Sequence, residues 1–258
     1  LYYSDPLNDD FAHTSIKPQP LPRTFKYVRK NFLWRIWANF VYYIIAKPFF
    51  VIASKIKYHH HFANKKVIKQ SKKSGLFIYA NHTMVSGDAF TPNIVFPFKR
   101  NYVVVSKEAM SIFGTRILLQ QLGVIPLSDK LSHKKQVIKT MEYRLKEKAS
   151  ITIYPEAHIW PYYNKIRPFD DSSFKYPVLF NAPVYAMTNC YQKRKHSNKP
   201  KVTTYFDGPF YPKENLSKQE NALYLRDEIF KAMNERAKYY STYEFIQYVY
   251  KPKEKDTI

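Results

Sequence analysis

The sequence has little cysteine, little glycine and few acidic residues. Its single cysteine, Cys190, excludes a disulfide framework and every zinc or iron–sulfur site that needs several cysteines. It has only five glycines, and the motifs G-x-G-x-x-G, G-x-x-x-x-G-K-S/T and G-x-S-x-G are missing, so dinucleotide-binding, P-loop and nucleophile-elbow enzymes lose their usual signatures. The first ten residues are acidic and lack the basic and apolar stretches of a signal peptide, so no secretion is expected.

Basic residues far outnumber acidic ones. The 258 residues contain 42 Lys and Arg against 20 Asp and Glu, a formal net charge of +22. Apolar residues make up 45% of the chain and aromatic residues 17%, which excludes a disordered linker because such chains lack the apolar surface that offsets ordering entropy. We therefore expect a folded domain with an anionic partner: a bilayer surface, an acidic carrier protein, a phosphorylated substrate or nucleic acid.

The stretch from Phe32 to Ala53 is strongly apolar. Its 22 residues include only two charges, Arg35 and Lys47, and the 11 residues between them are too few for a clean membrane span. Pro48 would break or kink a helix at this point. With its Trp and Tyr side chains and basic clusters on both sides, the stretch predicts an interfacial or re-entrant helical hairpin on an anionic bilayer. Two buried core helices are the alternative.

These features divide the chain into four segments. Residues 1–25 carry no clear signal, residues 26–63 form the membrane-associating hairpin with a basic neck, residues 64–240 form the main domain, and residues 241–258 are a Tyr- and Lys-rich tail. The neck includes the three adjacent histidines 59–61, which cannot all face one ion, so we expect a solvated neck and no metal. Because no secretion is expected, the chain would be a peripheral or monotopic protein on the cytoplasmic face of a membrane.

The main domain alternates strand-like and helix-like segments. The clearest helical periodicity spans residues 132–148, where Val137, Ile138, Met141 and Leu145 share one face. Strands that alternate with helices predict an α/β fold with a mainly parallel sheet flanked by helices. The strand-like runs are 76–80, 102–105, 124–127, 151–154, 184–187 and 202–206.

Two polar clusters follow predicted strands. Asn81 and His82 come directly after the strand 76–80, and Asp88 follows six positions after His82. If the loop folds back, the carboxylate can hold one ring nitrogen of His82 while the other faces a substrate proton, which is the arrangement of a general base. The alternative is a strand-end histidine and a helix cap without a chemical role.

The second cluster is Pro155-Glu156-Ala157-His158, after the strand 151–154. The carboxyl ends of parallel strands share one edge of a sheet, so both clusters are expected in one cleft. No serine elbow accompanies them, and Cys190 ends an apolar run and is expected in the core. A base without a nucleophile of its own favours direct attack by a substrate hydroxyl or amine on an activated acyl or phosphoryl centre.

Four successive blocks, NHTMVSGD, GVIPLSDK, ITIYPEAH and NAPVYAM, resemble those of the glycerolipid acyltransferase family, best known for its 1-acylglycerol-3-phosphate acyltransferases. The resemblance spans roughly residues 76–190 and identifies residues 64–240 as an acyltransferase domain. It implies that His82 is the base, that Asp88 is its orienting partner, and that Pro155 and Glu156 bind the acceptor.

The sequence departs from the family pattern in three places. Five residues separate His82 from Asp88 where the family usually has four, and we expect Gly87 to absorb the extra residue through its conformational freedom. The second block ends in Asp-Lys instead of an arginine, and the third has Ala-His-Ile instead of Gly-Thr-Arg. Two basic positions are therefore missing. Either the nearby Lys130, Lys165 and Arg167 replace them or the acceptor lacks a phosphate. The predicted substrate-binding residues are Asn81, Lys130, Pro155, Glu156, His158 and Arg167.

The resemblance implies transfer of a fatty acyl group from acyl-CoA or acyl-carrier protein, as co-substrate, to the hydroxyl of a lysophospholipid-like acceptor in phospholipid biosynthesis, with no bound cofactor. Three alternatives stay open. They are a phosphate-free acceptor such as a glycolipid, a thioesterase or lipid hydrolase that uses the same His82–Asp88 pair, and a non-enzymatic basic protein that binds membranes or nucleic acid. Trp160, Tyr162 and Tyr163 are expected either to line an acyl-chain tunnel or to pack in the core.

Overall fold

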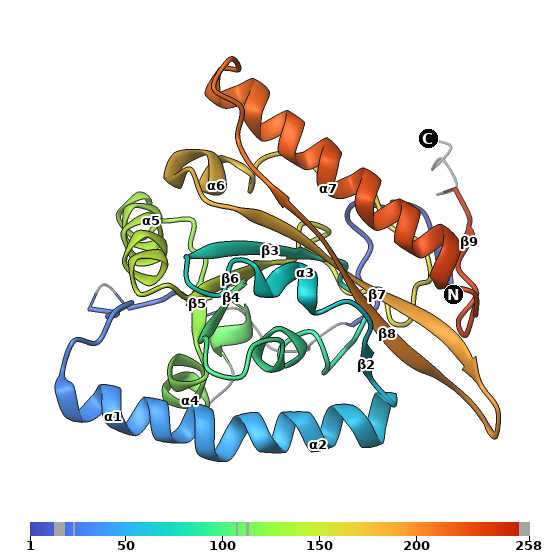
Figure 1. Ribbon diagram of the computed structural model, residues 1–258, viewed down its shortest axis with the longest axis horizontal. Helices are drawn as coiled ribbons and strands as arrows, with labels where there is room; N and C mark the ends of the chain where they lie inside the picture. Colours follow the sequence, from blue (N-terminus) through green and yellow to red (C-terminus); the bar gives the residue numbers. More distant parts are fainter. Residues whose placement is uncertain (13–18, 23, 107, 112–113, 253–258) are drawn as a thin grey trace, which may run out of the picture.

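A computed structural model of the chain describes residues 1–12, 19–22, 24–106, 108–111 and 114–252. Parts of the predicted terminal segments, residues 13–18, 23 and 253–258, lie outside the described residues. The centre of the molecule is a seven-stranded sheet in the order β2-β8-β7-β3-β6-β4-β5 (Figure 1). Its strands are β2 His61–Phe62, β3 Leu76–Ala80, β4 Asn101–Val105, β5 Val124–Pro126, β6 Ser150–Ile153, β7 Val184–Arg194 and β8 Ser197–Phe210.

Only β7 and β8 pair antiparallel among these strands, and the other neighbours run parallel. The predicted α/β fold with a mainly parallel, helix-flanked sheet is confirmed. Because helices cover both faces, β3 is buried at all five positions and its sequence, LFIYA, is apolar without alternation. The register pairs Phe77 with Ile151 of β6 and with Val184 of β7, which makes β3 the centre of the sheet.

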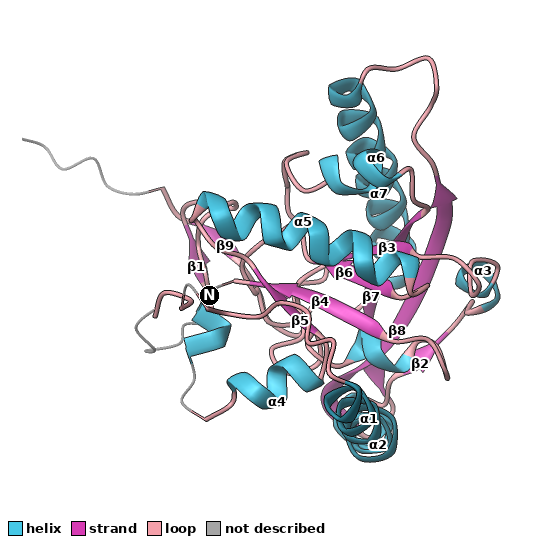
Figure 2. Cartoon of the chain, turned by 90° about the vertical axis from the view of Figure 1, so that its left-hand side faces the viewer, coloured by secondary structure: helices cyan, strands magenta, loops and turns pink. Residues whose placement is uncertain are grey.

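The helices form two layers (Figure 2). On one side, α5 and α7 bury Val137, Met141, Leu225 and Ile229 against the same face of β3 as Phe77, and α6 lies beside α7. On the other side lie the N-terminal helices and the short α3 and α4. The remaining helical elements are α3 Lys66–Lys69, the 3-10 turns Thr91–Ile94 and Glu108–Ser111, α4 Arg116–Gln121, α5 Leu131–Lys146, α6 Lys175–Phe180 and α7 Lys218–Tyr240.

The predicted N-terminal hairpin is wrong, because the chain does not reverse. Helix α1 (Phe32–Phe40) continues through a π-helical turn (Val41–Ala46) into α2 (Lys47–Tyr58), and the three lie end to end along one edge of the molecule (Figure 1). Proline lacks an N–H and its ring collides with the carbonyl four residues earlier in an α-helix. The wider turn, in which the Lys47 N–H bonds the Tyr42 carbonyl, accommodates Pro48 without ending the helix.

This continuous helix is apolar on its outer face as well as on its inner face. Ala38, Tyr42, Ala46 and Phe50 are buried against the domain. Over Phe32–Tyr58 the helix has 27 residues and is long and apolar enough to cross a bilayer by length and composition, although a third of its most apolar window is buried in the protein. The helix is compatible with membrane association. The exposed apolar side chains are Phe32, Leu33, Ile36, Trp37, Phe40, Ile44, Ile45, Phe49, Ile52 and Ile56.

The two ends of the described chain meet. Strand β1 (Tyr2–Tyr3) pairs parallel with β9 (Val249–Tyr250) in a separate two-stranded sheet. The tyrosine-rich tail therefore packs against the N-terminal segment, for which the sequence carried no clear signal.

The packing of α7 predicts a position-dependent loss of stability. Leu225 is fully buried, so Leu225→Ala should lower the free energy of unfolding by about 2–5 kcal/mol through lost burial and a residual cavity. Leu223→Ala, on the exposed side of the same helix, should change it by less than about 0.5 kcal/mol. Chemical denaturation of both variants measures the difference, and equal losses would contradict the packing described.

Candidate active site

The parallel pairing of β3 with β6 brings the two predicted polar clusters together. Asn81 and His82 follow the last residue of β3, and the segment Pro155–His158 follows β6 closely. The Trp160 N–H donates to the His82 carbonyl at 3.1 Å, and the Tyr162 N–H donates to the Thr83 carbonyl at 2.8 Å. The two loops therefore lie directly against each other at the carboxyl edge of the sheet.

The loop after β3 folds back so that His82 and Asp88 meet. The distance from His82 Nδ1 to Asp88 Oδ2 is 2.8 Å, and the same carboxylate oxygen accepts the Met84 N–H at 2.9 Å. Asp88 is buried, and burial raises the pKa of its carboxyl while the hydrogen bond from His82 opposes that rise. The His82 side chain keeps 16% of its surface exposed, so part of it is accessible from outside the protein.

Gly87 accommodates the longer loop in a way that the sequence did not predict. Its φ is not among the positive values found in the described chain, so conformational freedom is not what the position requires. A Cβ at residue 87 would lie 2.4 Å from Met84 Cε and 2.9 Å from Met84 Cβ. The residue is small because Met84 packs against its backbone where the chain turns back toward His82.

Tyr154 fixes the plane of the histidine ring. Its ring stacks on that of His82 with centroids 4.4 Å apart and an interplanar angle of 23°. Its hydroxyl donates to the Asp88 carbonyl at 2.6 Å. One side chain thus contacts both members of the pair. In the sequence, Tyr154 is only the end of a strand-like run, and its place directly before the Pro155 cluster is the one signal for this role.

Glu156 ties the backbone of the two loops together. Its Oε2 accepts the His82 N–H at 2.9 Å, and its Oε1 accepts the Arg167 N–H at 3.0 Å. The Arg167 guanidinium donates to the Glu156 carbonyl at 3.1 Å and lies 3.4 Å from its carboxylate, and it also bonds the His158 carbonyl. Burial raises the pKa of Glu156 and the neighbouring guanidinium opposes this, so the two charges compensate each other inside the protein.

The predicted substrate-binding residues fall into three groups: the buried Asn81, Glu156 and Arg167, the turn residues Pro155 and His158, and the exposed Lys130. Glu156 is 2% exposed, Arg167 is 1% exposed and Asn81 is 1% exposed, so these three lie beneath the surface beside His82 and Asp88. Asn81 accepts the Asn189 N–H at 2.8 Å and donates to the Asn189 carbonyl at 3.1 Å, which ties the residue after β3 to the middle of β7.

Pro155 and His158 lie at the turn after β6, where His158 Nδ1 is 3.8 Å from Asp10 Oδ2. Lys130 is exposed at the start of α5, after β5. Because β4 separates β5 from β6, Lys130 follows a strand two places removed from that of Glu156. Hydrogen bonds and an ion pair thus link Arg167 to Glu156, Glu156 to His82 and His82 to Asp88, with Asn81 next to His82 in the chain. Lys130 follows a different strand.

An aromatic cluster from both ends of the chain covers the Glu156 loop. Trp160 is fully buried, stacks on Tyr248 with centroids 4.9 Å apart, and donates its indole N–H to the Asp9 carbonyl at 2.7 Å. Tyr3 and Phe11 complete the cluster. Of the two roles expected for Trp160, the structure shows core packing. Residues distant in sequence supply its partners, so local patterns carried no signal for them.

The three adjacent histidines are not a uniformly solvated neck. His60 Nδ1 lies 2.8 Å from Ser54 Oγ and His60 Nε2 lies 2.6 Å from Thr204 Oγ1. Burial lowers the pKa of His60 to about 3, which keeps its ring neutral in this bridge between α2 and β8. Across the described ranges of the chain, no group of three or more His, Cys, Asp or Glu side chains is arranged to hold a metal ion.

Comparison with known proteins finds one matching family and a similar solved structure. The sequence model of the family described as Acyltransferase matches residues 58–189, just over half of the chain and all of the site. The structure is also similar to the crystal structure of the 1-acyl-sn-glycerophosphate acyltransferase PlsC from Thermotoga maritima, with a TM-score of 0.49 and 17% sequence identity. That match covers 79% of this chain and 93% of the other. Among curated proteins, no significant sequence match was found.

Ala157 yields a stability prediction. Its φ is +61°, a left-handed conformation that costs a residue with a Cβ about 1–2 kcal/mol, and glycine stands here in the family pattern. Ala157→Gly removes this strain but increases the entropy of the unfolded chain, so we expect a net gain of up to about 1 kcal/mol in unfolding free energy. Chemical denaturation measures the gain. Ala232→Gly within α7 is the control and should lose about 1 kcal/mol; a similar loss at Ala157 would contradict the strain.

Proposed function

The chain belongs to the acyltransferase family, and we propose that it moves a fatty acyl group from acyl-CoA or acyl-carrier protein to the hydroxyl of a lysophospholipid-like acceptor, with 1-acylglycerol-3-phosphate as the first candidate. The observation that carries this proposal is the 2.8 Å contact between His82 Nδ1 and the buried Asp88 carboxylate, with the His82 side chain still partly exposed. Cys190 does not offer an alternative nucleophile, because burial raises the pKa of its thiol to about 12.

The contact defines what each side chain does in the reaction. With the Nδ1 proton donated to Asp88, Nε2 of His82 is free to take the proton of the acceptor hydroxyl. The acceptor oxygen then attacks the thioester carbonyl carbon, the carbon–sulfur bond breaks, and the imidazolium returns the proton to the departing thiolate. Asp88 stabilises the imidazolium during this step and fixes the tautomer, while Tyr154 holds the ring in plane.

Glu156 and Arg167 are assigned to positioning rather than to direct acceptor contact. Both side chains are almost completely buried, and Glu156 uses both carboxylate oxygens on backbone N–H groups. An acceptor phosphate could reach Arg167 only by displacing Glu156 from a buried ion pair, which is costly. The role of Glu156 is therefore to hold the His82 backbone in place.

A second candidate acceptor, one without a phosphate, is favoured by the same geometry. Arg167 is bound to Glu156, and Lys130 follows a strand two places away from β6. The basic cluster that was expected to replace the missing arginines is therefore incomplete, because Arg167 is already engaged by Glu156. A monoacylglycerol or a glycolipid presents the same hydroxyl nucleophile and needs no such cluster.

The apolar helix supports delivery of the acceptor from a bilayer. The last turn of α2 reaches the catalytic loop, where Lys57 Nζ donates to Ser86 Oγ at 2.6 Å and Tyr58 packs against Met84. The exposed apolar face of α1 and α2 thus begins beside His82. If this face lies at the bilayer surface, the acceptor can reach the histidine without leaving the interface.

We expect His82→Ala to reduce acceptor-dependent thiol release to below about 1% of the wild-type rate, since a general base contributes roughly 10²–10⁴-fold. The assay measures thiol release from a long-chain acyl thioester by the protein in detergent, with lysophosphatidate, with a monoacylglycerol, or with no acceptor. His196→Ala, an exposed histidine in the β7–β8 turn, should keep full activity.

Comparison of the three acceptor conditions distinguishes the candidate functions. Release that requires lysophosphatidate supports the phosphate-bearing acceptor, and release with only the monoacylglycerol supports the phosphate-free one. Equal release without acceptor indicates a hydrolase. Full activity of His82→Ala would reject the proposed base.

A further prediction concerns Asp88. Asp88→Asn keeps the shape of the side chain but can donate to Nδ1 and thereby place the histidine proton on Nε2, where it blocks proton abstraction. The turnover rate should fall at least about 100-fold while acceptor KM changes little. Circular dichroism confirms the fold, and Asp170→Asn on the surface serves as the charge-matched control. A large rise in KM with normal turnover would contradict the role assigned to Asp88.

A further inference from the structure

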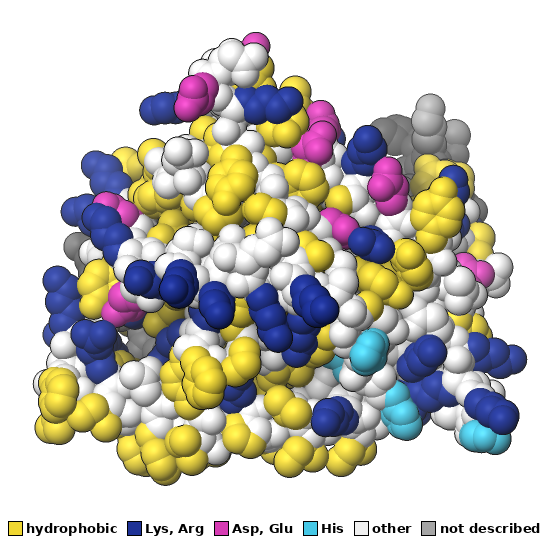
Figure 3. All heavy atoms as spheres, in the orientation of Figure 1, with side chains coloured by type: hydrophobic (Ala, Val, Ile, Leu, Met, Phe, Trp, Pro, Cys, Tyr) yellow, Lys and Arg dark blue, Asp and Glu magenta, His cyan; other side chains and the backbone are white. Residues whose placement is uncertain are grey.

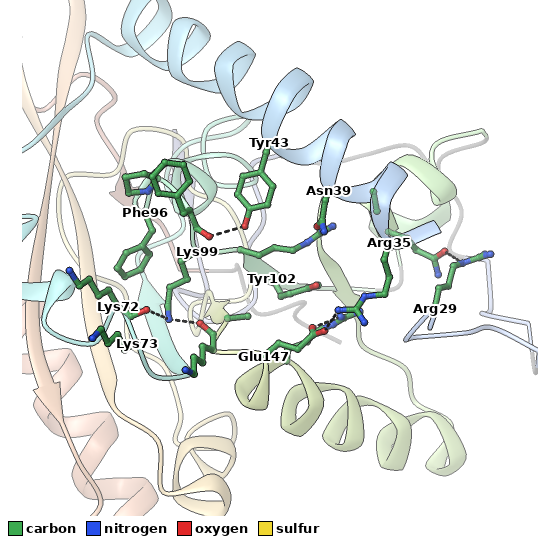
Figure 4. A pocket seen from close by; sticks show the side chains of 18 of the residues that line it. Arg29, Arg35, Asn39, Tyr43, Lys72, Lys73, Phe96, Lys99, Tyr102 and Glu147 are labelled. Carbon is green, nitrogen blue, oxygen red and sulfur yellow. Dashed lines mark hydrogen bonds and ion pairs between the residues drawn. The ribbon is translucent and has the colours of Figure 1, made fainter. Parts of the chain in front are cut away.

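A second cavity lies at the opposite edge of the sheet from His82. It has a volume of about 830 Å³ and is lined by α1, the end of α5 and three segments that each precede a parallel strand (Figure 4). Lys72 and Lys73 come before β3, Lys99 and Arg100 come before β4, and Lys148 comes before β6. The catalytic residues follow these strands, so the cavity is separate from the candidate active site.

The lining is strongly positive. It contains nine Lys and Arg residues and one carboxylate, Glu147, which already accepts Arg35 Nη2 at 3.1 Å and Arg144 Nη1 at 2.7 Å. Within the described ranges, no carboxylate lies within ion-pair distance of Lys72, Lys73 or Lys148. An anion that enters the cavity would therefore meet ammonium groups that have no acidic partner.

Lys99 contributes to this excess of positive charge from the cavity wall. Its ammonium donates to the Lys72 carbonyl at 3.3 Å and also bonds the carbonyls of Ser74 and Lys148. Burial, followed by the nearby charge of Lys148, lowers the pKa of Lys99 to about 8. A bound anion would offset both effects, and the carbonyl contacts of Lys99 hold the segments that precede β3 and β6 together around it.

The rim of the cavity is apolar. Trp34, Tyr43 and Phe98 line the cavity and are not buried, and Phe98 is 92% exposed. The Tyr43 hydroxyl donates to the Phe98 carbonyl at 3.1 Å, which holds that loop against the apolar helix. On the face shown in Figure 3, apolar side chains line the lower edge, where α1 and α2 lie, and a row of Lys and Arg crosses the middle of the face above them. Positive charge and exposed apolar surface therefore meet at the cavity mouth.

We propose that this cavity binds the phosphate headgroup of an anionic phospholipid that is not a reactant, with the phosphate near Lys72, Lys73 and Lys148 and the acyl chains along Phe98 and the exposed face of α1. The apolar rim suits an amphiphile and gives a free phosphate nothing to bury. Nucleic acid would bring no apolar part to the rim either. The proposal concerns binding alone and does not depend on acyl transfer.

The cavity and the catalytic loop lie at opposite ends of the long N-terminal helix. The 27 residues from Phe32 to Tyr58 span about 40 Å, with the cavity beside α1 and the catalytic loop beside the end of α2. A phospholipid held at one end and apolar contacts along the helix would keep the whole edge parallel to the bilayer. The catalytic loop would then face the interface.

Binding is tested with dihexanoyl phosphatidylglycerol and dihexanoyl phosphatidylcholine, both below their micellar concentrations. Intrinsic tryptophan fluorescence follows binding, because Trp34 lines the cavity. We expect the anionic lipid to bind the wild-type protein more tightly than the zwitterionic one. The double substitution Lys72→Gln, Lys73→Gln should weaken binding of the anionic lipid by about 10–100-fold, since two charged hydrogen-bond donors are lost. Both lysines are exposed, so the fold should not change.

Matched controls separate a site from diffuse attraction. Lys134→Gln with Lys135→Gln removes the same two charges from the exposed side of α5 and should change binding less than about twofold. Glu147→Gln should instead tighten binding, because it removes the one carboxylate of the cavity and releases Arg35 and Arg144. Glu142→Gln on the same helix is its control and should have no effect.

Four results would overturn the proposal. If the α5 double variant loses as much affinity for the anionic lipid as the Lys72→Gln, Lys73→Gln variant, the attraction is diffuse. If the two lipids bind equally well, the protein does not recognise the headgroup charge. No lipid binding at all would exclude the site. The last result combines two observations. If inorganic phosphate raises the melting temperature of the wild-type protein but not of the Lys72→Gln, Lys73→Gln variant, at constant ionic strength, and the anionic lipid is not preferred, the cavity is a site for a small free anion.

Discussion

The buried carboxylate of Glu156 holds the catalytic end of this protein together. It accepts one backbone N–H from the loop after β3, at His82, and another from Arg167 farther along its own loop, while the Arg167 guanidinium neutralises it. Such a pair is costly to desolvate, and removal of one partner typically costs about 3–5 kcal/mol because a buried charge is left alone. The pair therefore contributes little to the stability of the fold, and its main effect is to fix the position of the His82 backbone. It fixes the backbone from which the His82 ring reaches Asp88 and Tyr154.

The long N-terminal helix gives the fold its second organising constraint. It lies along one edge of the molecule, with Tyr58 beside the catalytic loop and Trp34 beside the basic cavity at the other end of β3. Its inner face belongs to the core and its outer face exposes a continuous apolar strip. One continuous helix therefore connects the candidate base His82, the surface expected to meet lipid and the cavity proposed for a headgroup. If the proposed transfer takes place at a bilayer, the direction of this helix sets how His82 faces it.

The sequence predicted the parts of this structure that depend on local pattern. Apolar runs followed by polar clusters located β3 and β6, and the shared edge of parallel strands predicted that His82 and Glu156 would meet. Local pattern could not show that a π-helical turn would accommodate Pro48, because that depends on a widened hydrogen bond. Nor could it show that both ends of the chain would enclose Trp160, since those partners are more than 80 residues away on the C-terminal side. The burial of Arg167, expected at the substrate, likewise follows from tertiary packing.

Steady-state kinetics of Glu156→Gln with a short-chain soluble acceptor distinguish a Glu156 that positions His82 from one that binds the acceptor. The carboxamide matches the shape of the side chain but replaces one accepting oxygen with a donor, so the His82 N–H or the Arg167 N–H loses its partner. If Glu156 positions His82, kcat falls while the acceptor KM stays within about twofold, in protein whose melting curve shows that it is folded. A large rise in KM with unchanged kcat would contradict this role, because that result would mean that Glu156 binds the acceptor directly.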